Sequence, residues 1–119
     1  MNRGDIWTIA GGPDYAGKPR PAVIVQDDRF DSTASVTVCA FTTNPTEGPL
    51  SRPLIEPSDL NKLRQASRIM VDKITTLPRR RVGTRLGQLD GDDIARLERA
   101  LLVFLGMAGP LPDQQNGRQ

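Results

Sequence analysis

Histidine is absent from this chain of 119 residues, and its absence excludes several kinds of chemistry at once. A Ser-His or Cys-His nucleophile, a histidine general acid or base, and an imidazole-based metal site all need that side chain. The single cysteine, Cys39, cannot form a disulfide within the chain. Its apolar neighbours at 36–41 predict a buried, inert thiol, and such sparing use of cysteine is typical of a reducing compartment.

Long apolar runs and aromatic side chains are also scarce. No stretch reaches the roughly 20 residues that span a membrane, and residues 1–5 lack the apolar core of a signal peptide. We therefore expect a cytoplasmic protein with no membrane partner. The aromatic side chains are one tryptophan, one tyrosine and three phenylalanines, which is few for a surface that binds RNA by base stacking.

Short β-branched segments, separated by turn-forming residues, make up most of the chain. The runs at 21–26 and 35–42 are apolar on both faces and predict central strands, whereas Pro53 gives the run around it the character of an edge strand. Apart from a single turn at 57–61, the predicted elements of this region are strands at 5–9, 21–26, 35–42, 50–56, 67–76 and 81–86.

One helix follows the strands. Asp90 is a suitable N-cap, and Gly106 or Gly109 can end the helix. An apolar face recurs at helical spacing and comprises Ile94, Leu97, Leu101, Phe104 and Leu105. Many short strands and one terminal helix predict a mainly β protein, a small antiparallel barrel or half-barrel with the helix packed on the sheet. We expect one domain at 1–109 and a polar tail at 110–119.

Arg20 stands between Pro19 and Pro21 at the start of the second predicted strand. Proline fixes its own φ near −65° and holds the preceding residue in extended backbone, and Lys18 precedes a proline as well. The backbone therefore presents both cations in a stiff conformation, which lowers the entropy lost when a guanidinium is ordered on a ligand. The simpler alternative is a solvated charge at a strand start.

The basic residues are concentrated in one part of the chain. Residues 62–85 hold eight lysines and arginines against the single acid Asp72, whereas 86–119 hold five acids against three bases. A cluster dominated by arginine is typical of a protein that binds a polyanion such as nucleic acid. A solvated loop and an acidic protein partner are the alternatives. The run at 79–81 follows Pro78 and is expected at the surface.

Polar side chains end the third predicted strand. Thr42, Thr43 and Asn44 are ordinary turn residues when they are taken alone. They become informative when two earlier sequence blocks are considered with them. The three blocks are Arg-Gly-Asp-Ile-Trp at 3–7, the Arg-Pro element within 18–26, and Ala-Phe-Thr-Thr at 40–43. Followed by 67–74 and the terminal helix, these blocks resemble, over roughly residues 2–107, the MazF/PemK family of toxin endoribonucleases from bacterial toxin–antitoxin pairs.

The resemblance implies an SH3-like barrel that forms a homodimer and pairs with a cognate MazE-like antitoxin. The activity it implies is sequence-specific cleavage of single-stranded RNA without a metal or other cofactor, as the toxin of a type II system. In this family the arginine of the Arg-Pro element and the threonine closing the third strand are the main catalytic pair, and they match Arg20 and Thr42. Attack by a ribose 2′-hydroxyl gives 2′,3′-cyclic phosphate and 5′-hydroxyl ends, and a guanidinium and a hydroxyl suit the charge that develops on the phosphate.

The group that moves protons is less well marked. One branch of the family has an arginine two residues before the acid of the fifth strand, and this chain has Met70 there and retains Asp72. Asp72 and Asp14 are the two carboxylates we nominate as a catalytic acid or base. The alternative for Asp72 is a role as a structural partner for Arg68 or Arg79.

Another branch has a histidine in the first loop, where Asp14 and Tyr15 are the nearest substitutes. RNA contacts are expected by position or by charge from Lys18, Asp14, Tyr15, Thr43, Asn44, Ser67, Arg68, Arg79, Arg80 and Arg81.

Two other functions fit a chain of this kind. The related gyrase poison CcdB shares the fold and acts through an exposed tryptophan near its C-terminus, but the only tryptophan here is Trp7. A non-catalytic RNA-binding barrel would carry more aromatic side chains than this chain has.

Overall fold

The structure is a computed structural model that describes residues 1–10, 18–45 and 52–109. Within these ranges the strands are β1 (Asp5–Ile9), β2 (Arg20–Ile24), β3 (Ser35–Thr42), β4 (Leu54–Ile55), β5 (Ser67–Ile69), β6 (Thr75–Pro78) and β7 (Val82–Gln88). The remaining elements are three 3-10 turns, η2 (Asp28–Phe30), η3 (Val71–Lys73) and η4 (Arg79–Arg81), and the helix α1 (Gly91–Phe104).

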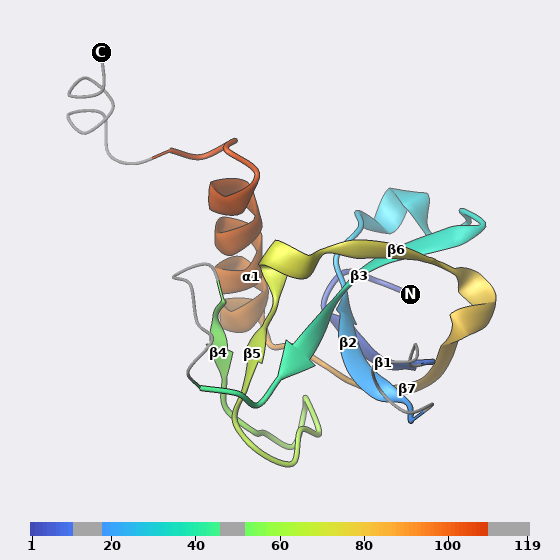
Figure 1. Ribbon diagram of the computed structural model, residues 1–119, viewed down its shortest axis with the longest axis horizontal. Helices are drawn as coiled ribbons and strands as arrows, with labels where there is room; N and C mark the ends of the chain where they lie inside the picture. The colour runs from blue at the N-terminus through green and yellow to red at the C-terminus, as the bar shows by residue number, and fades with distance from the viewer. Residues whose placement is uncertain (11–17, 46–51, 110–119) are drawn as a thin grey trace.

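All strand pairs in this sheet are antiparallel, in the order β4-β5-β3-β2-β1-β7, with β6 paired to β3 away from this path. The long strand β3 therefore has two partners on one edge, β6 along its first half and β5 at its last two residues. Figure 1 shows β1, β2, β3, β6 and β7 curving around a common interior, with α1, β4 and β5 on one side. The predicted half-barrel with one C-terminal helix is confirmed.

Most predicted strands lie close to their predicted positions. The strands at 5–9 and 35–42 are confirmed as β1 and β3, and those at 21–26 and 81–86 match β2 and β7 with ends shifted by one or two residues. The strand predicted at 50–56 is shorter than expected: residues 50–51 lie outside the described residues, and of 52–56 only Leu54–Ile55 form β4.

The prediction of one continuous strand at 67–76 is wrong. The segment forms β5, then η3, then β6. The amide of Met70 still donates to the carbonyl of Ala40 (3.0 Å), but the next residue, Val71, turns into the core and is fully buried. The alternation of apolar residues continues through this corner, so the sequence pattern resembled a single strand.

Two apolar clusters lie on the two faces of the central strands. Val23 and Cys39 belong to the cluster that packs against α1, whereas Ala22 and Val38 belong to the cluster inside the curved strands. Both faces of β2 and β3 are therefore covered, as the continuous apolar runs predicted. Burial raises the pKa of the Cys39 thiol to about 12, so its interpretation as an inert core residue is confirmed.

The helix begins and ends where its capping residues predict. The side chain of Asp90 accepts a hydrogen bond from the amide of Asp93 (2.8 Å), and Gly106 adopts a φ of 75° just after the last turn. Leu97 on the inner face is fully buried. Phe104 and Leu105, which were predicted on the same face, are 43% and 52% exposed, because the last turn extends past the sheet.

The domain boundary at 109 stays a prediction, since the tail at 110–119 lies outside the described residues. Among the residues that are described, no helix is long and apolar enough to cross a membrane.

Two glycines permit a direct test of the packing around β7. A Cβ on Gly87 would lie 2.5 Å from the carbonyl oxygen of Leu60 in the predicted 57–61 turn, whereas a Cβ on Gly91, the first residue of α1, meets nothing within 4 Å. Gly87→Ala should lower the free energy of unfolding by about 1–3 kcal/mol, and Gly91→Ala should raise it by about 0.4–1 kcal/mol. Urea titrations of both variants measure this, and equal effects would contradict the close approach.

Candidate active site at the ends of β2 and β3

Arg20 and Thr42 lie at neighbouring ends of two paired strands. The β2–β3 register joins Ala22 to Ala40 and Ile24 to Val38, and continuing it by two residues puts Arg20 opposite Thr42. Cross-strand neighbours in such a pair have Cβ atoms about 4.5–5.5 Å apart on one face of the sheet. The fold therefore brings together the two residues that the resemblance nominated as a catalytic pair.

Local sequence explains why this end of the sheet is open. Arg20 is the first residue of β2 and is exposed, and Pro21 beside it has no amide hydrogen to donate to a ladder. Thr42 is the last residue of β3, and its hydroxyl oxygen accepts a hydrogen bond from the amide of Asn44 (3.2 Å). That bond uses a lone pair, so the hydroxyl hydrogen can still be donated to a ligand.

The neighbouring candidates differ in how accessible they are. Lys18, Thr43 and Asn44 are exposed near the ends of β2 and β3, and Arg68 on β5 is paired to Thr42. Ser67 is only 5% exposed, and its hydroxyl donates to the carbonyl of Gln65 (2.9 Å). This burial argues against the predicted RNA contact of Ser67. The remaining two candidates, Asp14 and Tyr15, lie outside the described residues.

Asp72 is engaged in an ion pair that the sequence did not indicate. Its two carboxylate oxygens accept hydrogen bonds from Nε and Nη2 of Arg52, at 2.7 and 2.8 Å. Neither Arg68 nor Arg79 is the partner, so that part of the structural alternative is wrong. The Arg52 guanidinium holds the pKa of Asp72 below its ordinary value of 3.8, which makes this carboxyl a poor proton donor at neutral pH.

Arg52 was missed because no local pattern marks it. It precedes a proline at the start of a weak strand, and its importance depends on a carboxylate 20 positions further along the chain. The one available signal is that Asp72 is the single acid within 62–85.

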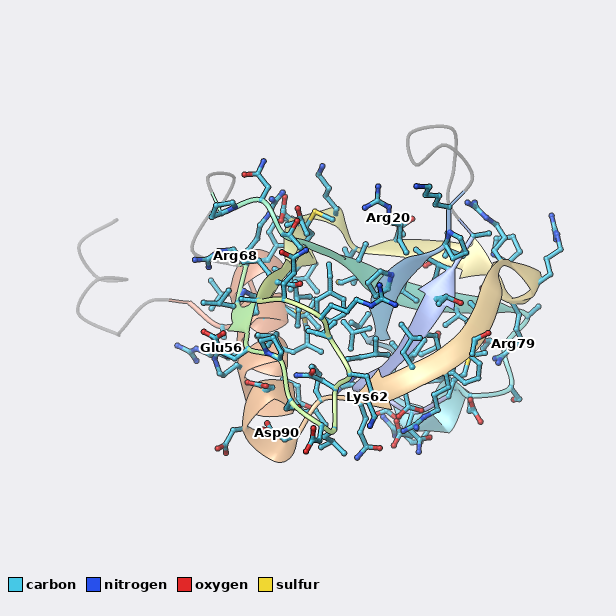
Figure 2. All side chains as sticks on the ribbon, turned by 90° about the horizontal axis from the view of Figure 1, so that it is seen from below. Arg20, Glu56, Lys62, Arg68, Arg79 and Asp90 are labelled. Atoms are coloured by element: carbon cyan, nitrogen blue, oxygen red, sulfur yellow. The ribbon has the colours of Figure 1, made fainter. Side chains whose placement is uncertain are left out.

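The basic segment at 62–85 does not form a single face. It runs through β5, which lies beyond β3, and through β7, which lies beyond β1. In Figure 2, Arg20 and Arg68 lie on the upper side of the molecule and Lys62 lies on the lower side. The predicted footprint for a polyanion is therefore smaller than the sequence count suggests.

The arginines at 79–81 have different surroundings. Arg79 donates from Nε to the carbonyl of Thr33 (2.9 Å) and from Nη2 to the carbonyls of Thr33 and Asp31, so its guanidinium ties η4 to the turn before β3. Arg81 donates to the carbonyl of Ala10 (2.9 Å). Arg80 is exposed, as predicted for the run, and is the most accessible of the three.

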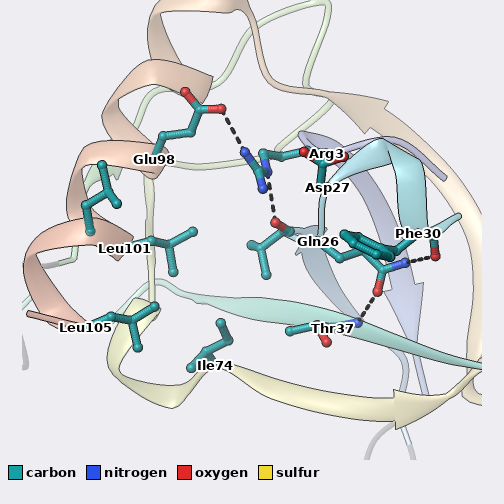
Figure 3. A pocket seen from close by; sticks show the side chains of 11 residues that line it. Arg3, Gln26, Asp27, Phe30, Thr37, Ile74, Glu98, Leu101 and Leu105 are labelled. Atoms are coloured by element: carbon teal, nitrogen blue, oxygen red, sulfur yellow. Dashed lines mark hydrogen bonds and ion pairs between the residues drawn. The ribbon is translucent and has the colours of Figure 1, made fainter. Parts of the chain in front are cut away.

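A separate apolar pocket of about 560 Å³ lies at the opposite ends of β2 and β3, between these strands and α1. Figure 3 shows Leu101 and Leu105 of the helix facing Ile74 across it, with Arg3 and Glu98 paired at 3.0 Å on one wall. The pocket contains none of the predicted site residues. Among the described residues, no group of three acidic or cysteine side chains is placed to hold a metal ion.

The family model of the PemK-like, MazF-like toxins of type II toxin–antitoxin systems matches residues 2–105. The chain belongs to this family. The match covers every described strand and the whole helix, and it confirms the resemblance that the sequence blocks indicated.

Individual relatives agree with this assignment. The chain is 55% identical over 109 residues to a probable endoribonuclease MazF of Mycolicibacterium smegmatis, which covers 92% of this chain and 100% of the relative. Two solved structures share the fold. One is an endoribonuclease in complex with its cognate antitoxin from a mycobacterial species (TM-score 0.76, 24% identity, 92% of this chain and 99% of that chain). The other is a MazE–MazF complex from Deinococcus radiodurans (TM-score 0.68, 19% identity, 91% of this chain and 98% of that chain).

The ion pair of Asp72 predicts how stability depends on pH. At neutral pH, Asp72→Asn should lower the free energy of unfolding. An exposed ion pair contributes about 1 kcal/mol and breaking a fully buried one costs about 3–5 kcal/mol, and the loss should lie between these two values. Because the pKa of Asp72 in the folded protein is below 3.8, this stabilisation is complete above that pH and is lost as the pH falls through the lowered value.

Urea titrations of the native chain and of Asp72→Asn over a pH series measure the difference. It should shrink as the pH falls below 3.8. Asp59→Asn, which removes an exposed carboxylate in the 57–61 turn, serves as the control for general charge effects. A difference between native chain and Asp72→Asn that is independent of pH would exclude the ion pair as its cause.

Proposed function

We propose that this toxin is a metal-independent, sequence-specific endoribonuclease that cleaves single-stranded RNA with Arg20 and Thr42 as its catalytic pair. The observation that supports the proposal is the β2–β3 register, since Arg20 falls opposite Thr42 when the ladder is continued by two residues beyond Ala22 and Ala40. The high identity to a probable endoribonuclease MazF supports the same activity.

The chemistry follows from what the two side chains can donate. The 2′-hydroxyl of a ribose gives its proton to a base, and its oxygen attacks the adjacent phosphorus. The bond to the 5′-oxygen of the next nucleotide breaks, and that oxygen takes up a proton from an acid. The products are a 2′,3′-cyclic phosphate and a 5′-hydroxyl end. Negative charge develops on the phosphoryl oxygens in the transition state, where the Arg20 guanidinium and the Thr42 hydroxyl stabilise it.

We assign the remaining roles by position. Lys18, Thr43 and Asn44 lie near the pair and bind the RNA backbone. Arg68 donates from Nη1 to the carbonyl of Arg52 and contacts RNA through its remaining N–H groups, and Arg80 contributes a more distant phosphate contact. Arg79 and Arg81 act mainly by holding their turn in place, because their guanidinium groups bind backbone carbonyls.

Proton transfer is assigned to the first loop. Asp72 is unsuited to it because both of its oxygens bind Arg52. Asp14 and Tyr15 therefore remain the groups that we propose for this step.

The family assignment also weighs on the alternatives. A gyrase poison related to CcdB is disfavoured because the family model is that of the MazF-like toxins and because Trp7 is partly buried against the inner apolar cluster. We propose that the toxin acts in the cytoplasm, where its RNA substrate is, and that a cognate MazE-like antitoxin binds it. The two related structures with antitoxins support such a partner.

We further propose that the toxin is a homodimer. The helix-end surface consists of exposed apolar side chains at and beyond the last turn of α1, namely Leu102, Val103, Phe104, Leu105 and Met107. A helix turn that is apolar all round has no orientation that buries it within one subunit. A second copy of the chain covers this surface in our proposal.

The catalytic proposal predicts a large and specific loss of activity. Arg20→Ala and Thr42→Ala should each lower the rate of RNA cleavage in the presence of EDTA by about 10²–10³-fold, because each removes a donor to the charge of the transition state. The measurement is an end-mapped digest of a defined RNA, with circular dichroism as the check on folding. Full activity of Arg20→Ala would refute the mechanism.

Matched controls are available on the far side of the fold. Arg99→Ala removes an exposed guanidinium from α1, and Thr75→Ala removes an exposed hydroxyl from β6. Both should cleave the same RNA at the native rate. A comparable loss in these controls would indicate a general effect of charge or stability instead of catalysis.

The assembly proposal predicts that the helix-end surface holds the dimer together. The native chain should run as a dimer in size-exclusion chromatography with light scattering, and Leu102→Asp/Leu105→Asp should run as a folded monomer, since buried unpaired charges oppose association. Leu60→Asp, at a 43% exposed position in the 57–61 turn, is the control and should remain dimeric. A native monomer at micromolar concentration would contradict the proposal.

A further inference from the structure

The Arg52–Asp72 pair joins two segments that lie on either side of β5. Arg52 precedes β4, and Asp72 lies in η3 directly after β5. The main chain reinforces the link, because the carbonyl of Arg52 accepts a hydrogen bond from Nη1 of Arg68 and the carbonyl of Pro53 accepts one from the amide of Ile69, both at 3.0 Å. Arg52 therefore holds the C-terminal part of β5 twice, through its side chain to Asp72 and through its carbonyl to the Arg68 guanidinium.

This region is the support of Thr42. Arg68 is paired to Thr42 and Ile69 to Phe41, so β5 is the strand against which the end of β3 rests, with β4 outside it at the edge of the sheet. The strands themselves are short, with three residues in β5 and two in β4. β-Ladders of this length contribute few hydrogen bonds, so the positions of β4 and β5 depend on restraints from side chains.

The ion pair has the properties of such a restraint. The Arg52 side chain is 8% exposed and that of Asp72 is 23% exposed, so water competes weakly for the bonds between them. Two parallel N–H···O bonds from one planar guanidinium fix orientation as well as distance. Breaking the pair by removing either member is costly, because both groups lie where water solvates them poorly.

We propose that Arg52 is a positioning residue of the RNA-cleaving site: through Asp72 and Arg68 it fixes Thr42 against Arg20. This inference rests on the proposed function. Its structural basis is that the two residues lie on different strands. Arg20 belongs to β2, which pairs with one edge of β3, whereas Thr42 is paired to β5 at the other edge of β3. A displacement of β5 would therefore change the separation of the two donors from the phosphate, and misplacement by about 1 Å costs about 100-fold in rate.

A catalytic role and a positioning role of Asp72 make opposite predictions. If Asp72 acts as a catalytic acid or base, its replacement removes one limb of the pH profile of the cleavage rate, and replacement of Arg52 has a different effect. A carboxylate that serves to hold Arg52 gives the same defect when either partner is removed. Both limbs of the pH profile then remain.

The test is a double-mutant cycle with Arg52→Gln, Asp72→Asn and the double variant, on a short RNA with a mapped cleavage site. Each single variant should lower the single-turnover cleavage rate by about 10–100-fold, and the double variant should be no slower than the slower single variant. Binding of the same oligonucleotide with a 2′-deoxy group at the cleavage position should change by less than about threefold, because the defect lies in alignment at the transition state.

Each outcome has one interpretation. A pH limb lost in Asp72→Asn alone would overturn the proposal in favour of acid–base catalysis. A native cleavage rate per folded molecule in all three variants, with only a lower melting temperature, would assign the pair to stability and would also overturn it. Arg52→Lys keeps the positive charge but cannot form two parallel hydrogen bonds to the carboxylate. A cleavage rate of this variant above that of Arg52→Gln would support the positioning role.

Glu98→Gln is the matched control for breaking an ion pair. It removes the carboxylate that binds Arg3, a partly buried arginine at the opposite ends of β2 and β3, with an N–O distance of 3.0 Å. This variant should lose stability and keep the native cleavage rate. If the native protein does not cleave RNA in EDTA, both the proposed function and the positioning role are refuted. If the native protein cleaves RNA and the Arg52 and Asp72 variants cleave it equally fast, only the positioning role is refuted.

Discussion

The antiparallel register of β2 and β3 is the constraint on which the site depends, because side chains on paired strands alternate between the two faces of a sheet. A slip by one residue would turn Arg20 and Thr42 toward opposite faces and would move the apolar residues of both strands away from their clusters. Burial of both faces therefore fixes the register, and the register fixes the two polar residues at its open end. Core packing and the arrangement of the two proposed catalytic donors have one common cause.

A site without histidine must rely on fixed charge and hydrogen-bond donors. The Arg20 guanidinium supplies a planar set of N–H donors, and the Thr42 hydroxyl supplies an O–H donor. Such donors are effective only if they are held in place before the substrate arrives. The proline residues on either side of Arg20 supply rigidity on β2, and the Arg52–Asp72 pair supplies it on the side of β5. The two halves of the site are thus stiffened by unrelated devices, one in the backbone and one in the side chains.

Local sequence was enough to predict the features that depend on neighbouring residues. The strand at 35–42 and the N-cap Asp90 follow from alternation and capping chemistry, which involve positions close together in the chain. The strand at 67–76 was wrong because the corner at η3 is imposed by β3, which changes its partner there. Propensity cannot detect a change of partner.

Charge was the least predictable property of the candidate site. A count of basic residues at 62–85 does not show where the fold places them. The chain carries them to opposite sides of the half-barrel, and backbone carbonyls bind the Arg79 guanidinium. Arg52 could not be found because its partner is distant in sequence. What the family blocks added was the pairing of Arg20 with Thr42, which no composition or periodicity contains.

The small size of β4 and β5 has a consequence for how the molecule loses its shape. With so few ladder bonds, these two strands are held mainly by their side chains, since Ile55 and Ile69 are fully buried in the core cluster that also contains Leu97 of α1. Separating β5 from β3 therefore breaks core packing and the Arg52–Asp72 bonds at the same time. The support of Thr42 is thus lost together with the packing of the helix and not as an isolated fraying of the edge.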